Sequence, residues 1–166
     1  TGKSPLVPVV LLDQPGGSYW EDALGFIRRQ LGDNGYILPT DLNLMHLVYS
    51  AEEAVDEIAR FYRNFHSSRW LKQEFVIRMN HSLNEQALEH MQTAFADMCL
   101  SGQFRQHTYS GEEHDEVQFS HLARLSFVFN ARDNGRLREL IDFINLPENW
   151  AQAQGKTQQR VAPQPA

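Results

Sequence analysis

"LVPVVLL", residues 6–12, is a continuous apolar run of strand length near the start of the chain. Such a run is typical of a strand buried on both faces, as in the interior of a parallel sheet. A strand of that kind needs neighbouring strands and covering helices, and the following residues supply only part of one α/β layer. We therefore expect its sheet partners to lie upstream or on another chain.

The segments that follow alternate between helix and strand. Residues 18–35 predict a helix that begins at Ser18, with Glu21 as the capping-box partner. "MHLVYS", residues 45–50, predicts a second short strand. Ser50 and Glu53 form another capping box, which begins a helix over residues 51–65. The apolar stripe expected to face the interior from this helix is Ala51, Val55, Ile58, Tyr62 and Phe65.

The pattern changes after residue 70. "EFVIRMN", residues 74–80, alternates in the manner of a strand, with Phe75, Ile77 and Met79 on one face. A helix is predicted from Ser82 to about Leu100, followed by strands over 103–110 and 123–130 and a closing helix capped by Asp133. This β-α-β-β-α order resembles a ferredoxin-like or ACT-like antiparallel sheet with helices on one side.

The predicted organisation is therefore an α/β chain in three parts. Residues 1–70 form the end of a parallel α/β sheet layer, and residues 71–146 form a small α+β domain. Residues 147–166, rich in Gln, Pro and Ala, predict a disordered tail.

The composition argues against several classes of protein, among them nonspecific nucleic-acid-binding and membrane-spanning proteins. The 166 residues are 42% hydrophobic, enough for a globular core, and the net charge of −6 argues against nonspecific binding to nucleic acid. No stretch approaches the roughly 18 to 20 apolar residues of a membrane span. Cys99 is the one cysteine and, placed on the apolar stripe of the 82–100 helix, is expected in the core; no metal-binding motif is present. We expect a cytoplasmic protein without a metal site.

"FYRNFHSSRW", residues 61–70, is the densest group of hydrogen-bond donors in the chain. Arginine forks with hydroxyl and imidazole groups can hold a phosphate or a carboxylate. The candidate nucleotide- or anion-binding residues are Arg60, Arg63, His66, Ser67, Ser68 and Arg69. The alternative is structural: Asp56 pairs with Arg60, the aromatic residues enter the core, and His66 and Arg69 complement a helix end.

Two other segments favour structural roles. "QPGGSYW", residues 14–20, lies between a strand and a helix but lacks the complete glycine motifs of phosphate-binding loops. The acidic run Glu112, Glu113, Asp115 and Glu116 predicts a solvated loop. No Ser-His-Asp or Cys-His catalytic set can be assembled, so no catalytic residue is proposed.

Residues 1–31, 35–70 and 129–145 together resemble the carboxyl-terminal half of bacterial LOG (Lonely Guy) family proteins. The most specific features are "PVVLLD", the glycine turn with an aromatic pair, "GYI", "DL" and "SAEEAVDEI". "FYRNFHSSRW" resembles a feature of a longer-chain branch with an extra carboxyl-terminal domain.

The resemblance implies a Rossmann-like enzyme that hydrolyses the N-glycosidic bond of nucleoside 5′-monophosphates, such as AMP or cytokinin ribotides. It implies no metal or redox cofactor, and a homo-oligomer in the full-length form. The family's PGGxGTxxE motif is absent: after Pro15, Gly16 and Gly17 the required positions hold Tyr19, Trp20 and Ala23. We therefore expect a carboxyl-terminal fragment that is inactive alone.

Two alternatives remain open. The first is a non-catalytic module that binds a small ligand or mediates oligomerisation. The second, an RNA-binding ferredoxin-like domain, needs exposed aromatic residues flanked by basic ones, whereas Phe127 and Phe129 are expected on the core face.

Overall fold

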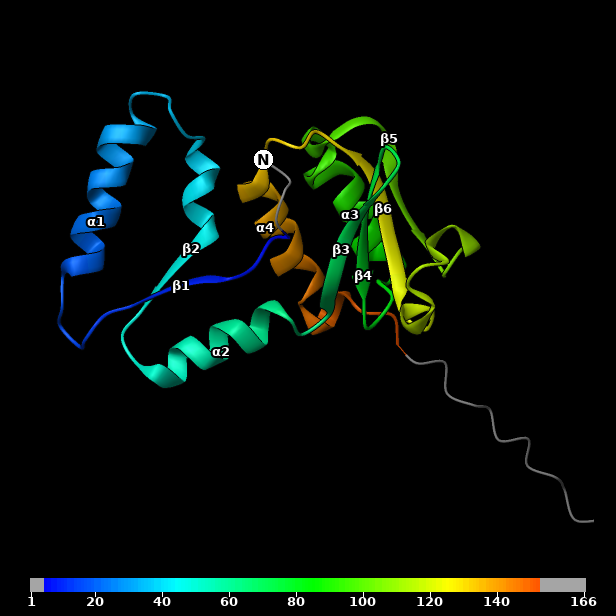
Figure 1. Cartoon of the computed structure of the whole chain (residues 1–166), viewed down its shortest axis with the longest axis horizontal. Helices are drawn as coiled ribbons and strands as arrows, with labels where there is room; N and C mark the ends of the chain where they lie inside the picture. Colours follow the sequence, from blue (N-terminus) through cyan, green and yellow to red (C-terminus); the bar gives the residue numbers. More distant parts are fainter. Residues whose placement is uncertain (1–4, 153–166) are drawn as a thin grey trace, which may run out of the picture.

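The computed structural model describes residues 5–152 (Figure 1). Its first part holds two parallel strands, β1 (Val9–Leu12) and β2 (Met45–Val48), paired from Val9 with Met45 to Leu12 with Val48. Helix α1 (Tyr19–Ile27), a π-helical turn (Arg28–Gly32) and a 3₁₀ turn (Pro39–Leu44) connect the two strands, and α2 (Ala51–Phe61) follows.

The second part is a four-stranded antiparallel sheet. Its strands are β3 (Phe65–Leu71), β4 (Glu74–Met79), β5 (Cys99–His107) and β6 (Ala123–Phe129), in the spatial order β3-β4-β6-β5. Helices α3 (Glu85–Ala94) and α4 (Asn134–Ile144) complete it. The chain is therefore a mixed α/β protein, with one parallel and one antiparallel sheet, and the prediction of a mixed α/β fold is confirmed at this level.

The hydrophobic core lies between this sheet and helices α3 and α4. Alternation along β4 turns Phe75, Ile77 and Met79 into the core, as the sequence pattern predicts. The other core residues from the sheet and the helices are Phe65, Phe104, Leu125, Phe127, Phe129, Ala87, Met91, Leu137, Leu140, Ile141 and Ile144. Figure 1 shows α4 on one side of the sheet and the segment between β5 and β6 on the other.

The predicted helix over residues 51–65 is wrong at its end, because α2 stops at Phe61 and Phe65 begins β3. The buried side chain of Asn145 accepts hydrogen bonds from the backbone N–H groups of Asn64 and Phe65, both at 2.8 Å. These hydrogen bonds fix the backbone at Asn64 and Phe65, where the chain leaves α2 and enters β3. Strand β3 pairs with β4, so the order is β-β-α-β-β-α, one strand more than predicted, and residues 65–70 belong to the antiparallel sheet.

The helix predicted for residues 82–100 is shorter than expected. It begins after Asn84, whose side chain accepts a hydrogen bond from Ala87 N at 2.8 Å, so Asn84 and not Ser82 is the cap. The helix ends at Ala94, and Cys99 begins β5 with its side chain partly buried. The Ser50 cap is confirmed, since Glu53 N donates to Ser50 Oγ at 3.1 Å.

The prediction of a disordered tail is wrong for its first residues, 147–152, because they contact the folded part of the chain. Pro147–Asn149 form a 3₁₀ turn, and Trp150 bridges to Leu83 and donates from Nε1 to Ile144 O at 2.9 Å. The remainder of the predicted tail, residues 153–166, lies outside the described residues.

The first part of the chain leaves its apolar residues uncovered. Val9 and Leu12 of β1 are 41% and 49% exposed, and no residue of α1 is buried. Of the predicted inward stripe, Val55 and Ile58 on α2 and Tyr62 directly after it are exposed. The prediction that residues 6–12 form a strand buried on both faces is therefore wrong within the described residues, because this strand remains exposed there.

Among the residues described, every helix is too short or too polar to span a bilayer.

Candidate functional site

The face of the antiparallel sheet that points away from the helices is rich in hydrogen-bond donors. Arg78 of β4 lies directly opposite Arg124 of β6, and Val76 lies opposite Ser126. On the outer strands, Ser67 of β3 pairs with Arg78 and His107 of β5 pairs with Arg124. In the same way, Arg69 of β3 pairs with Val76 and Arg105 of β5 pairs with Ser126. We call this surface the arginine face; its residues are Ser67, Arg69, Val76, Arg78, Arg105, His107, Arg124 and Ser126.

Residues 108–122, which connect β5 to β6, cover the arginine face, and we call them the acidic cover. Glu113 is buried, and its carboxylate accepts hydrogen bonds from Arg78 Nε at 2.8 Å and Arg124 Nε at 2.9 Å. Glu116 accepts from both Arg78 and Arg69. The expectation of a solvated loop is therefore wrong for Glu113, because two arginines from the sheet draw it inward.

Aromatic rings at both ends of the cover rest on the same arginines. The guanidinium carbon of Arg78 lies 5.0 Å from the ring centre of Phe119, and that of Arg124 lies 5.2 Å from the ring centre of Tyr109. Cation–π contacts of this kind add to the ion pairs. The cover thus binds the arginines through both carboxylates and rings.

The arginines of this face lower the pKa values of the two glutamates that they bind. Burial by itself would raise the pKa of Glu113, but the hydrogen bonds from Arg124 and Arg78 outweigh it and lower that pKa. The hydrogen bond from Arg78 likewise lowers the pKa of Glu116. Glu113 is therefore a carboxylate at neutral pH, and it separates two arginines that would otherwise repel each other.

Two buried polar atoms on β6 have no hydrogen-bond partner within the described residues: Arg124 Nη2 and Ser126 Oγ. Both residues are 0% exposed and point to the arginine face. Buried polar atoms are nearly always paired in folded proteins. The carboxylates of the cover therefore satisfy only part of the donor capacity of this face.

Of the six predicted anion-binding residues, Ser67 and Arg69 belong to this face, and His66 lies next to it. Arg69 donates to Asp115 Oδ1 at 2.9 Å, and His66 Nδ1 lies 2.9 Å from Ser67 Oγ. The ring of His66 packs 4.9 Å from that of Phe119. Burial, with a smaller effect of the nearby Arg78 charge, lowers the pKa of His66.

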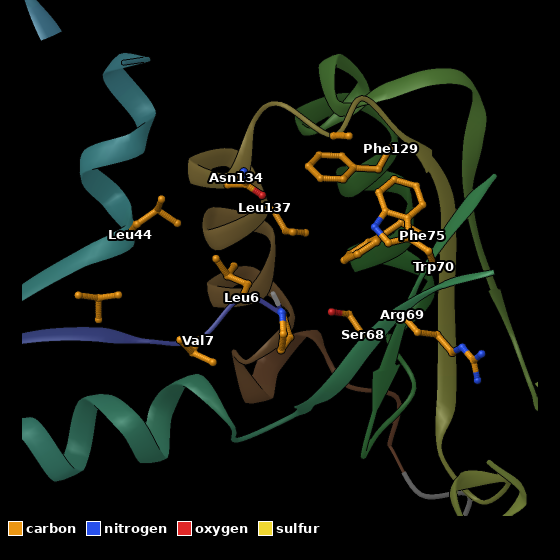
Figure 2. A pocket seen from close by; sticks show the side chains of 13 residues that line it. Leu6, Val7, Leu44, Ser68, Arg69, Trp70, Phe75, Phe129, Asn134 and Leu137 are labelled. Atoms are coloured by element: carbon orange, nitrogen blue, oxygen red, sulfur yellow. The ribbon is translucent and has the colours of Figure 1, made fainter. Parts of the chain in front are cut away.

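Ser68 lies on the opposite side of β3. It lines an apolar cleft of about 520 Å³ with Leu6, Trp70 and Phe129. Figure 2 shows the Ser68 hydroxyl directed into this cleft, whereas the Arg69 guanidinium extends away from it. Strand alternation thus separates two neighbours that the sequence grouped together.

Arg60 and Arg63 lie in a third place. They line a groove of about 630 Å³ beside β2 and α2, together with His46, Glu53 and Asp56. Arg60 donates to the buried carboxylate of Glu57, which also accepts from Arg138 of α4. The structure therefore distributes the six predicted residues over three surfaces.

Sequence reasoning missed the centre of the arginine face, Arg78, Arg124 and Glu113. The alternation of "EFVIRMN" and "ARLSFVFN" does place one arginine on the outward face of each strand. That signal identifies the face, but only the pairing of the strands makes the two arginines neighbours.

The chemistry of the arginine face fits an anion. Guanidinium and hydroxyl donors bind phosphate and carboxylate groups, and arginine does so in a bidentate manner. Within residues 5–152, no three His, Cys, Asp or Glu side chains are arranged to hold a metal ion.

Comparisons of the chain with protein-family models, with curated proteins and with solved structures found no match.

Proposed function

We propose that this chain is the carboxyl-terminal part of a cytoplasmic LOG-family protein, whose full-length relatives hydrolyse nucleoside 5′-monophosphates to a base and ribose 5-phosphate. The proposal rests on the resemblance of the sequence segments and on one structural observation, the uncovered parallel strand β1. By itself the chain lacks the PGGxGTxxE motif, so it is inactive as a hydrolase.

Strand β1 supports a larger Rossmann-like sheet. It runs parallel to β2, consists of four apolar residues, and has no second neighbour among residues 5–152. Parallel strands are normally paired on both edges and covered on both faces. A further parallel strand beside β1, with helices across it, would bury the exposed Val9 and Leu12.

The groove beside α2 is the part of this chain proposed to contact the nucleotide or another small anion. Arg63 lines it without a hydrogen-bond partner for its side chain among the described contacts, while Arg60 is engaged by Glu57. Hydrolysis through an oxocarbenium-like transition state also requires carboxylates near the ribose, and the family motif supplies one of them.

The test is activity of the chain extended by the region encoded upstream in the same reading frame. We expect the extended protein to release adenine from AMP and the chain alone to release none, with the Glu→Gln variant of the PGGxGTxxE motif as the inactive control. An upstream frame without that motif, or an extended protein that leaves nucleoside monophosphates intact, would overturn the proposal.

A second candidate function is association between copies through α2. Val55 and Ile58 are 64% and 45% exposed on this helix. Acidic residues occupy its first half and Arg60 its end, so two antiparallel copies place opposite charges side by side.

This association is tested by light scattering after size-exclusion chromatography. We expect a dimer for the wild-type chain and a monomer for Ile58→Glu, because a carboxylate would enter the apolar contact. The control Gln86→Glu adds the same charge on the exposed face of α3 and should remain dimeric. A monomeric wild-type chain rules out this contact.

A further inference from the structure

We propose that the arginine face is a binding site for a small anion with two adjacent phosphoryl groups, and that the acidic cover occupies this site as an internal mimic of that anion. This inference is independent of the nucleotide hydrolase proposal, because it concerns the antiparallel sheet alone.

Two buried positive charges lie side by side on the arginine face. Arg78 and Arg124 are directly opposite on adjacent strands and are 2% and 0% exposed. Like charges in this arrangement destabilise a sheet unless an anion lies between them. Replacing a buried ion pair by apolar residues of similar size is often neutral or stabilising in proteins, so a buried ion cluster is weak evidence for a purely stabilising role.

Two carboxylates of the acidic cover each bridge two of the arginines. Glu113 bridges Arg78 and Arg124, and Glu116 bridges Arg78 and Arg69. Two anionic groups thus lie in a row along three guanidinium groups from three neighbouring strands. A diphosphate also carries two linked anionic groups, and arginine forks bind phosphoryl oxygens in the same way as carboxylates.

The carboxylates of the acidic cover leave two hydrogen-bond donors of the arginine face without an acceptor among residues 5–152. A carboxylate has two oxygens, whereas a terminal phosphoryl group has three. Arg124 Nη2 and Ser126 Oγ, both buried, have no partner within the described residues. The two oxygens of the Glu113 carboxylate leave these two donors unpaired. The third oxygen of a phosphoryl group at the same position supplies an additional acceptor for them.

The acidic cover can leave the arginine face as a unit. Its backbone hydrogen bonds are local, for example from Glu116 N to Glu113 O at 2.9 Å and from Ser120 N to Val117 O at 2.9 Å. The cover forms two short 3₁₀ turns and adds no strand to the sheet. Side-chain contacts hold it in place, so a competing anion can replace them without unfolding β5 or β6.

The experiment is titration calorimetry of the full chain with inorganic pyrophosphate at constant ionic strength. The main variant is Asp115→Asn with Glu116→Gln, which weakens the cover and keeps the buried Glu113. We expect this double variant to bind pyrophosphate at least fivefold more tightly than the wild-type chain. The control Glu112→Gln removes a carboxylate that pairs with Lys72, outside the arginine face, and should bind like the wild type.

Two further measurements make the result decisive. Arg69→Ala should weaken pyrophosphate binding by the double variant at least tenfold. In the wild-type chain, pyrophosphate should accelerate amide hydrogen exchange in residues 108–122, while chloride at equal ionic strength should not. Failure of both the wild-type chain and the double variant to bind pyrophosphate, or equal affinity of the double variant and Glu112→Gln, overturns the proposal. If the double variant does not fold, unchanged hydrogen exchange in the wild-type chain overturns it.

Discussion

Arg78 and Arg124 lie directly opposite each other on adjacent antiparallel strands, and both donate hydrogen bonds to the carboxylate of Glu113. All three side chains are at most 2% exposed. Removing the carboxylate leaves two buried cations facing each other, so the acidic cover and the sheet depend on one another for their stability.

Glu113→Gln should therefore lower the free energy of unfolding by about 3 to 5 kcal/mol, the usual cost of breaking a buried ion pair. Urea denaturation measures this change. The exposed pair of Glu112 with Lys72 provides the control, since Glu112→Gln should cost less than about 1 kcal/mol. Similar losses for the two variants would show that burial of Glu113 has no energetic consequence.

Stability should depend on pH through Glu57. Burial by itself would raise the pKa of this carboxyl, but hydrogen bonds from Arg138 and Arg60 lower it below its ordinary value. The folded state therefore binds fewer protons than the unfolded state near pH 4. The stabilisation is complete above the unfolded pKa of about 4.3 and is lost as the pH falls through the lower folded value.

The measurement is urea denaturation of the wild-type chain and Glu57→Gln between pH 7 and pH 3. The difference in unfolding free energy between the two proteins should be largest at pH 7 and should shrink below about pH 4.3. A difference that stays constant over this range would contradict the shifted pKa.

Gly135 allows the start of α4 to contact the turn at Pro39–Leu44. A Cβ atom at this position would overlap the backbone of Thr40. Gly135→Ala should therefore destabilise the protein by about 1 to 3 kcal/mol, as in other overpacked interiors. In thermal unfolding, the control Gly111→Ala should differ little from the wild type, since nothing lies within 4 Å of its added carbon.

Asn145 holds the turn between α2 and β3. Its side chain accepts from Asn64 N and Phe65 N and donates to Phe61 O. Asn145→Ala leaves these three buried backbone groups without partners, at about 1 to 3 kcal/mol each, so a loss of at least about 3 kcal/mol is expected in urea denaturation. The exposed control Asn43→Ala, which loses one hydrogen bond to Glu139, should cost less than about 1 kcal/mol.

Local patterns were sufficient for several elements. The alternation of Phe75, Ile77 and Met79 identified β4 and its core face, and Ser50 with Glu53 marked the start of α2. Such features depend on residues within one turn or one strand, and the sequence displays them directly. The six predicted anion-binding residues, by contrast, share only their proximity in the sequence. Strand alternation places two of them, Ser68 and Arg69, on opposite sides of β3.

By itself, the sequence determined the secondary-structure types of the main segments and the mixed α/β class, because periodicity and capping act over a few residues. Only the tertiary structure decided that Phe65 begins a strand, since Asn145 lies 80 positions from it in the sequence. The tertiary structure also decided that Glu113 is buried. That burial requires arginines from β4 and β6 to meet across a sheet, and strand register, unlike periodicity, is a property of two segments at once.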